Sequence, residues 1–141
     1  MRIRRYNDRI GGGFPLKLVK FRIAQEYFAL PIETIRSIER VPTVRRVPTA
    51  PSHIVGIANL RGTVVTVIDM RQRLGAVLAP WGDDTRLLVT KDAAYLVDEA
   101  LDILEVDEAL IEWRNREGDS AHGVFQEHDH VVGVLRLDVL A

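Results

Sequence analysis

Residues 54–75 read IVGIANLRGTVVTVIDMRQRLG, and this stretch decides the fold. It holds two apolar runs, over 54–60 and 63–70, on either side of a tight turn at Asn59-Leu60-Arg61-Gly62. Such runs predict two buried strands joined as a hairpin. The second run has apolar residues on both faces, which predicts a strand buried on both sides. Two buried strands explain the apolar residues, but they do not explain why the turn carries an arginine, Arg61. Because no catalytic set of residues surrounds this arginine, the turn indicates a recognition surface rather than an active site.

Most other segments also predict short strands. Alternating or continuous apolar residues indicate strands at residues 16–23, 27–31, 86–90, 93–97, 100–106, 123–126 and 131–140. Strands that alternate with long helices are not seen, which indicates a mainly β protein rather than an α/β one. A closed barrel or a pair of barrels is the natural arrangement, because it leaves no open sheet edges.

Helical segments are predicted to be few and short. Asp69 is expected to cap a helix over 71–74 that ends at Gly75. Isoleucines at 32, 35 and 38 fit either one or two helical turns or a strand edge. Residues 101–110 fit a helix as well as a strand. The sequence therefore predicts one or two short helices in a β framework.

Composition and charge exclude several classes of protein. The chain has 141 residues, enough for one domain with its own core. Its net charge is −1, so the molecule as a whole is not drawn to nucleic acid or to an anionic membrane. The absence of cysteine excludes disulfides, thiolate catalysis and cysteine-based zinc sites, and it suits a reducing cytosol. No apolar run approaches the roughly 20 residues that a membrane-spanning helix needs.

The first 14 residues have a different character from the rest. They contain four arginines and no apolar run of the kind that a secretory signal carries. The glycines at 11–13 read as a hinge. We therefore expect a flexible basic N-terminal tail over 1–14 and a single domain over 15–141, with contact between the tail and a partner as the alternative.

A metal site is the alternative function that the residues themselves suggest. His128 and His130, flanked by Glu127 and Asp129, form a cluster in which two histidines of one strand share a face and can bind one ion. A third ligand such as His122 must also converge. The other interpretation is a solvated turn between two strands, which is the interpretation we adopt, with no metal or other cofactor.

Other chemistries have weaker support. No serine sits in a nucleophile elbow, and no glycine-rich phosphate loop follows a strand. A nucleic-acid-binding barrel would use Arg45, Arg46 and Arg61, but few aromatic residues lie near them for stacking. We therefore predict a protein that is not an enzyme and does not bind nucleic acid.

Several stretches together resemble the CheW-like domain of bacterial chemotaxis adaptors. They are LVKFRI at 18–23, YFALPI at 27–32, RVPTAP at 46–51, NLRGTVVTVIDMR at 59–71 with LG at 74–75, and LVDEAL at 96–101. The resemblance covers 16–106 well and 123–140 loosely. It implies two small five-stranded β-barrels that share an apolar core.

The same resemblance implies a non-enzymatic adaptor in the cytoplasm, peripheral to receptor arrays. Such proteins couple the cytoplasmic tips of chemoreceptors (methyl-accepting chemotaxis proteins) to the regulatory domain of a CheA-type histidine kinase, and weak self-association is a further expectation. No insertion into the membrane is implied. The contact surface that we expect consists of Ile35, Ser37, Val44, Arg45, Asn59, Arg61 and Gly62.

Alternatives stay open at two of these residues, and several positions depart from the family, among them Thr66 in place of a common proline and Ala94 in place of a frequent glycine. Arg61 either reaches a partner carboxylate or carbonyl, or bonds to carbonyls of its own barrel. Ile35 either faces a partner or packs in the core beside its neighbouring isoleucines. Ser37 replaces a glutamate that is usual in the family, so one charge-assisted contact is expected to be lost. Thr49 replaces the usual asparagine of the Val-Pro-Asn-Ala-Pro segment. Residues 111–122 resemble nothing in the family.

Overall fold

Twelve strands, one α-helix and two 3-10 turns make up the computed structural model, which describes residues 3–6, 14–74, 81–114 and 122–135. The elements are β1 Ile3–Tyr6, β2 Pro15–Ile23, β3 Glu26–Pro31, η1 Ile32–Thr34, β4 Ile35–Arg40, β5 Ile54–Leu60, β6 Thr63–Asp69, α1 Met70–Arg73, β7 Arg86–Thr90, β8 Ala94–Val97, β9 Glu99–Asp107, η2 Glu108–Leu110, β10 Glu112–Trp113, β11 Gly123–Glu127 and β12 His130–Val134. The prediction of a mainly β protein is confirmed.

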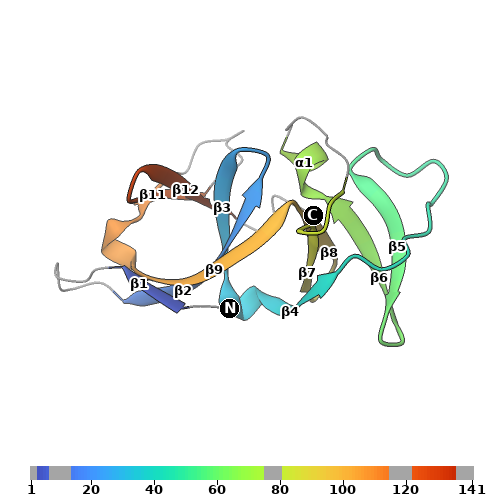
Figure 1. Ribbon diagram of the computed structural model, residues 1–141, viewed down its shortest axis with the longest axis horizontal. Helices are drawn as coiled ribbons and strands as arrows, with labels where there is room; N and C mark the ends of the chain where they lie inside the picture. Colours follow the sequence, from blue (N-terminus) through green and yellow to red (C-terminus); the bar gives the residue numbers. More distant parts are fainter. Residues whose placement is uncertain (1–2, 7–13, 75–80, 115–121, 136–141) are drawn as a thin grey trace.

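The strands form two sheets that lie side by side as two lobes (Figure 1). The first has the strand order β1-β9-β2-β3-β12-β11-β10 and the second β4-β7-β8-β6-β5. The second sheet has the five strands expected for each barrel. The first has seven, because β1 and the two-residue β10 add to its two edges.

A shared core joins the two lobes. One cluster of buried side chains draws Phe21 and Leu30 from the first sheet and Leu88 and Tyr95 from the second. Two further clusters, one within each sheet, contain Leu104 and Val67 among others. The chain passes between the sheets at Asp98, directly from β8 to β9. The expected pair of sheets with a common apolar core is therefore confirmed.

The local predictions that left alternatives are resolved by the structure. The isoleucine-rich segment contains both of the predicted structures: a 3-10 turn at Ile32–Thr34 is followed by strand β4. Residues 99–107 are strand, so the helix alternative is wrong apart from the 3-10 turn at Glu108–Leu110. The cap prediction is confirmed, because the Asp69 side chain accepts a hydrogen bond from the Arg71 amide at 2.9 Å. Gly75, the expected end of this helix, lies outside the described residues.

Strand β6 is buried along only part of its length, so the prediction of burial on both sides is wrong for its first half. Val64 is 64% exposed, whereas Val67 is fully buried. The reason is register: β6 pairs with β8 only from Val67 to Asp69. Residues 63–66 have β5 on one side and extend past the end of β8, as the projecting β5–β6 hairpin in Figure 1 shows.

Strand β1 lies within the segment that we expected to be a flexible tail. Ile3–Tyr6 pairs in parallel with β9, with Ile3 opposite Ile103 and Tyr6 opposite Val106. Without this strand, the outer edge of β9 would present unpaired N–H and C=O groups between Ile103 and Val106, which accounts for a pairing that composition does not reveal. Residues 7–13, with the expected glycine hinge, lie outside the described residues. The division into a tail and one domain stays a prediction.

Candidate functional site

The β5–β6 hairpin ends in a turn of two residues with left-handed backbone conformations. Leu60 is opposite Thr63, and between them Arg61 has φ +54° and Gly62 has φ +86°. Positive φ at both central residues is the pattern of a type I′ turn, which suits the twist of the flanking strands. The Asn59 side chain supports this turn, because its Oδ1 accepts a hydrogen bond from the Gly62 amide at 2.9 Å.

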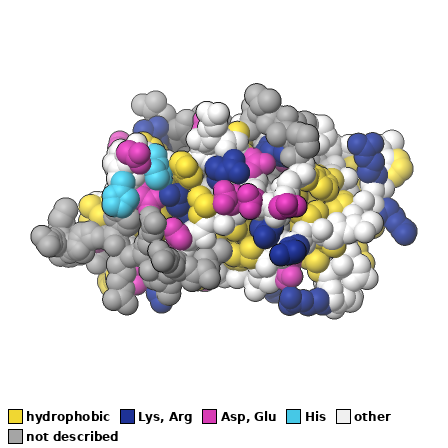
Figure 2. Space-filling view, in the orientation of Figure 1, with side chains coloured by type: hydrophobic (Ala, Val, Ile, Leu, Met, Phe, Trp, Pro, Cys, Tyr) yellow, Lys and Arg dark blue, Asp and Glu magenta, His cyan; other side chains and the backbone are white. Residues whose placement is uncertain are grey.

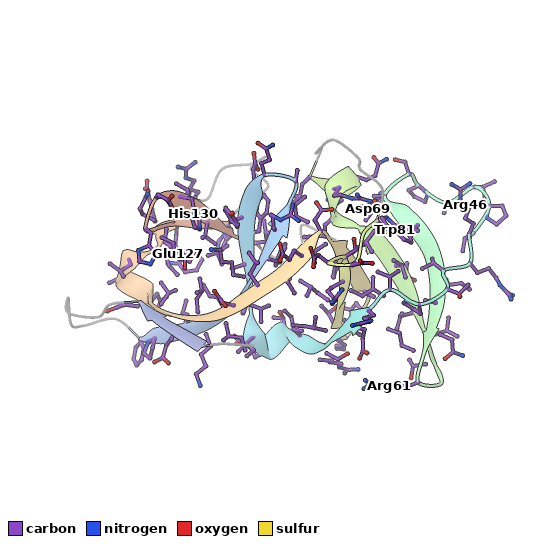
Figure 3. All side chains as sticks on the ribbon, viewed as in Figure 1. Arg46, Arg61, Asp69, Trp81, Glu127 and His130 are labelled. Atoms are coloured by element: carbon purple, nitrogen blue, oxygen red, sulfur yellow. The ribbon has the colours of Figure 1, made fainter. Side chains whose placement is uncertain are left out.

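Arg61 occupies the tip of this turn, at the end of the projecting β5–β6 hairpin (Figure 3). Its side chain is 79% exposed, and its Nη2 lies 3.2 Å from Oε1 of Glu39. A left-handed conformation costs an L-residue other than glycine about 1 kcal/mol or more, and asparagine tolerates it better than arginine does. An ion pair this exposed contributes less than about 1 kcal/mol. Local stability therefore does not explain an arginine here.

The internal contact of Arg61 is to a carboxylate rather than to the carbonyls that we considered. Glu39 lies two residues beyond Ser37 on β4, and residues two apart in a strand share a face. Ser37, where the resemblance described above leads us to expect a carboxylate, carries no charge. Glu39 occupies the next position on that face of β4, and its ion pair brings a carboxylate close to Arg61.

A shallow groove of about 360 Å³ adjoins the hairpin and is lined by Thr43, Arg45, Ile57, Ala58, Asn59 and Val64. Arg45 closes one part of it by exchanging two main-chain hydrogen bonds with Ile57, both 2.8 Å. Gly56 permits this approach, because a Cβ there would lie 2.1 Å from the Arg45 carbonyl oxygen. We define the hairpin rim as Arg45, Asn59, Arg61, Gly62 and Val64.

The remaining residues of the expected contact surface are half-buried rather than exposed. Ile35 is half-buried and packs against the shared core, as the core-packing alternative predicted. Val44 is half-buried against the core of the second sheet. Ser37 is half-buried on β4, opposite Val89. The structure thus places Asn59, Arg61 and Gly62 at the end of one hairpin and Arg45 beside β5 of that hairpin, and it leaves Ile35, Ser37 and Val44 half-buried.

A buried charge cluster at the joint between the sheets was missed by the sequence analysis. Arg71 is 3% exposed, and its guanidinium lies 3.1 Å from Oδ2 of Asp69 and 3.5 Å from Oδ1 of Asp98. Asp98 also accepts a hydrogen bond from the Ala24 amide at 2.6 Å. The cluster thereby ties α1, the β8–β9 junction and the β2–β3 turn. Acidic and basic residues at the end of a buried strand were the available signal, and Asp69 was interpreted only as a cap.

The histidine cluster contains a lysine where the metal hypothesis needs an ion. Nε2 of His130 lies 2.8 Å from the Lys20 ammonium and 3.1 Å from Oε1 of Glu127, and the same Glu127 oxygen forms an ion pair with Lys20. His130 also hydrogen-bonds to Asp129, and this bond lowers the pKa of the Asp129 carboxyl. His122, the expected third ligand, packs on Trp113 with ring centroids 5.0 Å apart.

Two other kinds of feature, a metal centre and a membrane-spanning helix, are not found among the described residues. Within residues 3–6, 14–74, 81–114 and 122–135, no group of three or more His, Asp or Glu side chains is arranged to hold a metal ion. No helix among these residues is both long enough and apolar enough to cross a membrane. The candidate site is therefore the hairpin rim with the groove beside it, because these hold the exposed arginine of the turn.

The fold and the rim define a class of protein: a small two-sheet β domain that presents a strained, exposed arginine at the tip of a hairpin. Residues 17–141 match the model of the CheW-like domain. The chain is 34% identical to the chemotaxis protein CheW of Bacillus subtilis over 100 residues, which are 68% of this chain and 64% of that protein. It is 30% identical to CheW of Helicobacter pylori over 131 residues, which are 87% of this chain and 79% of that protein.

A solved structure supports the same assignment. The crystal structure of the scaffolding protein TtCheW from Thermoanaerobacter tengcongensis superposes with a TM-score of 0.80 at 25% identity, over 87% of this chain and 90% of that one. The chain belongs to the CheW-like domain family.

Proposed function

We propose that this protein is a non-enzymatic adaptor that couples chemoreceptors to a CheA-type histidine kinase, in bacterial chemotaxis or a related motility pathway. The family match over residues 17–141 and the relatives that carry the name chemotaxis protein CheW support this role. The similarity to a protein described as scaffolding supports an adaptor rather than a catalyst. The adaptor acts in the cytoplasm, at the tips of the receptors.

The observation that carries the proposal is the conformation of Arg61. The backbone of this residue is strained, its side chain is 79% exposed and its ion pair is weak. Arg61 therefore lowers the stability of the fold, and no local contact compensates for it. An exposed guanidinium on a rigid hairpin can form two parallel hydrogen bonds with a carboxylate of a partner. Arginine is also among the residues that dominate binding energy at interfaces.

The contact surface in this proposal centres on the hairpin rim. Arg45, Asn59, Arg61 and Gly62 are exposed, Arg45 and Asn59 line one groove, and Arg61 and Gly62 form the turn that follows Asn59; together they form the centre of the contact. Ile35, Ser37 and Val44 are half-buried, so they contribute through the partial exposure they retain and by supporting the strands beneath. Weak self-association through a sheet edge is a secondary contact in the same proposal.

The test is calorimetric titration of the purified protein with the regulatory domain of the CheA-type kinase from its own source. The expected result is saturable binding with a dissociation constant in the micromolar range. A cytoplasmic receptor fragment is titrated in the same way, first alone and then after the kinase domain. If neither partner binds to correctly folded protein, the adaptor proposal is wrong.

A further inference from the structure

The free edge of β5 is only partly covered. This strand lies at the end of the order β4-β7-β8-β6-β5, so β6 satisfies one side of it and the other side faces outward. Arg45 covers the middle of the outer side, because it exchanges both main-chain hydrogen bonds with Ile57. Beyond Ile57 the strand continues to Leu60 and the turn.

Strand geometry fixes where the main chain of Asn59 points. In an antiparallel pair, each residue directs its N–H and C=O to the same side, and that side alternates from one residue to the next. Ile57 directs both groups outward, to Arg45. The register with β6 is regular from Gly56 to Leu60, so Asn59, two residues further on, also directs its N–H and C=O outward.

Those two groups of Asn59 meet no strand of this chain within the described residues. An extension of the Arg45–Ile57 bridge would bring Thr43 opposite Asn59, but the bridge is isolated and ends at Arg45. Thr43 and Asn59 instead line the shallow groove of about 360 Å³. Across the part of the chain that the structure describes, no main-chain hydrogen bond reaches Asn59 from this side. The result is an open position for one more strand, beside a groove.

The surroundings of this position define the chemistry of what fits it. Arg45, Arg46 and Arg61 are exposed, and in the described part of the chain only Arg61 of these three forms an ion pair, with Glu39. Figure 2 shows Lys and Arg side chains along the outer edge of the lobe that holds β5. Val64 adds an apolar surface to the groove. A segment with acidic and apolar side chains complements this combination.

We propose that the edge of β5 at Asn59 accepts an extended, acidic segment of the kinase regulatory domain as an added strand; this proposal rests on the adaptor function proposed above. Main-chain hydrogen bonds to Asn59 hold the segment, and its acidic side chains reach the exposed arginines. Addition of a strand to an exposed sheet edge is a general mode of peptide recognition, in which the main chain gives affinity and the side chains give specificity.

The decisive comparison is between Asn59→Pro and Asn59→Ala. Both variants lose the Oδ1 bond to the Gly62 amide, and only the proline also removes the outward N–H group. Proline is tolerated on an edge strand where its missing N–H would face solvent, so the fold is expected to survive. The kinase domain is expected to bind Asn59→Pro about tenfold more weakly than Asn59→Ala, in line with the loss of one main-chain hydrogen bond.

Amide hydrogen exchange in the wild-type protein provides a second measurement that needs no variant. The kinase regulatory domain is added to ¹⁵N-labelled protein, and the exchange of the Asn59 amide is followed by NMR. Slower exchange on binding is expected. If Asn59→Pro melts below the assay temperature, this exchange measurement alone decides whether a strand is added at Asn59.

The outcomes separate this proposal from the one on which it rests. Failure of the wild-type protein to bind the kinase domain overturns both. Normal binding with equal affinities for the two variants and unchanged exchange at Asn59 overturns strand addition alone. Slower exchange at Asn59 on raising the concentration of the protein without the kinase assigns the edge to a second copy of this chain instead, and also overturns the proposal.

Discussion

Replacement of Arg61 by asparagine and by alanine is expected to change stability in opposite directions. An asparagine side chain at this position would accept the left-handed conformation that costs arginine about 1 kcal/mol. Both substitutions lose the pair with Glu39, which at 79% exposure of the arginine contributes about 0.5 kcal/mol. The net change is a gain of about 0.5 kcal/mol for asparagine and a loss of about 0.5 kcal/mol for alanine, which keeps the strain.

These free energies correspond to small but measurable shifts in melting temperature. For a chain of this size, about 0.5 kcal/mol moves the midpoint by about 1–2 °C, which differential scanning calorimetry resolves. Binding to the kinase regulatory domain is expected to weaken by about tenfold for both variants, as for an interfacial arginine. A protein that becomes more stable and less active by one substitution is the expected signature of strain kept for function.

Two results would refute this reasoning. If Arg61→Asn were less stable than Arg61→Ala, the turn would not carry the strain that its φ of +54° implies. If both variants bound the kinase domain as tightly as the wild-type protein, Arg61 would not belong to the contact. A joint loss of stability and binding in both variants would instead make the pair with Glu39 a structural tie.

The remaining predictions concern stability, pH and metal. Thr49 has φ +64°, where the family's asparagine is better tolerated, so Thr49→Asn should raise the unfolding free energy by about 1 kcal/mol in a denaturant titration. Gly56→Ala should lower it by about 3 kcal/mol, because the new Cβ would meet the Arg45 carbonyl; a wild-type denaturation midpoint would contradict this. Burial raises the pKa of Tyr95 above 10.0, so the stability of the neutral phenol is present below pH 10.0 and is lost as pH rises through the folded pKa. Alkaline unfolding of Tyr95→Phe should therefore be less steep. Zinc should leave the melting temperature unchanged, since Lys20 fills the histidine cluster; a rise would revive the metal hypothesis.

Local sequence patterns were sufficient for most of the secondary structure. Alternating apolar residues predicted β2, and continuous apolar runs predicted β5, β6 and β7. These patterns are readable because the pleat of a strand turns successive side chains to opposite faces. The Asp69 cap was predictable for the same reason, since donor and acceptor lie two residues apart. The length of the strand that is buried was not predictable, because it depends on how far β8 reaches beside β6.

The candidate site was predicted in its residues but not in its contacts. Asn59, Arg61 and Gly62 form one turn, so the sequence placed them together directly. The partner of Arg61 was not predictable, since Glu39 lies 22 residues away on a strand that does not belong to the hairpin. The interpretation of Ile35 needed the shared core, which forms only when the two sheets meet.

The sequence alone determined that this chain is a mainly β member of the CheW-like family with an arginine-tipped hairpin, because strand periodicity, turn chemistry and motif are properties of neighbouring residues. The tertiary structure alone decided which charges are buried and which edge stays open. Lys20 meets Glu127 across 107 positions, and Asn59 has no neighbouring strand on its outer side in the described part of the chain, because the bridge ends at Arg45. Such features depend on how distant segments pack, and no local pattern encodes them.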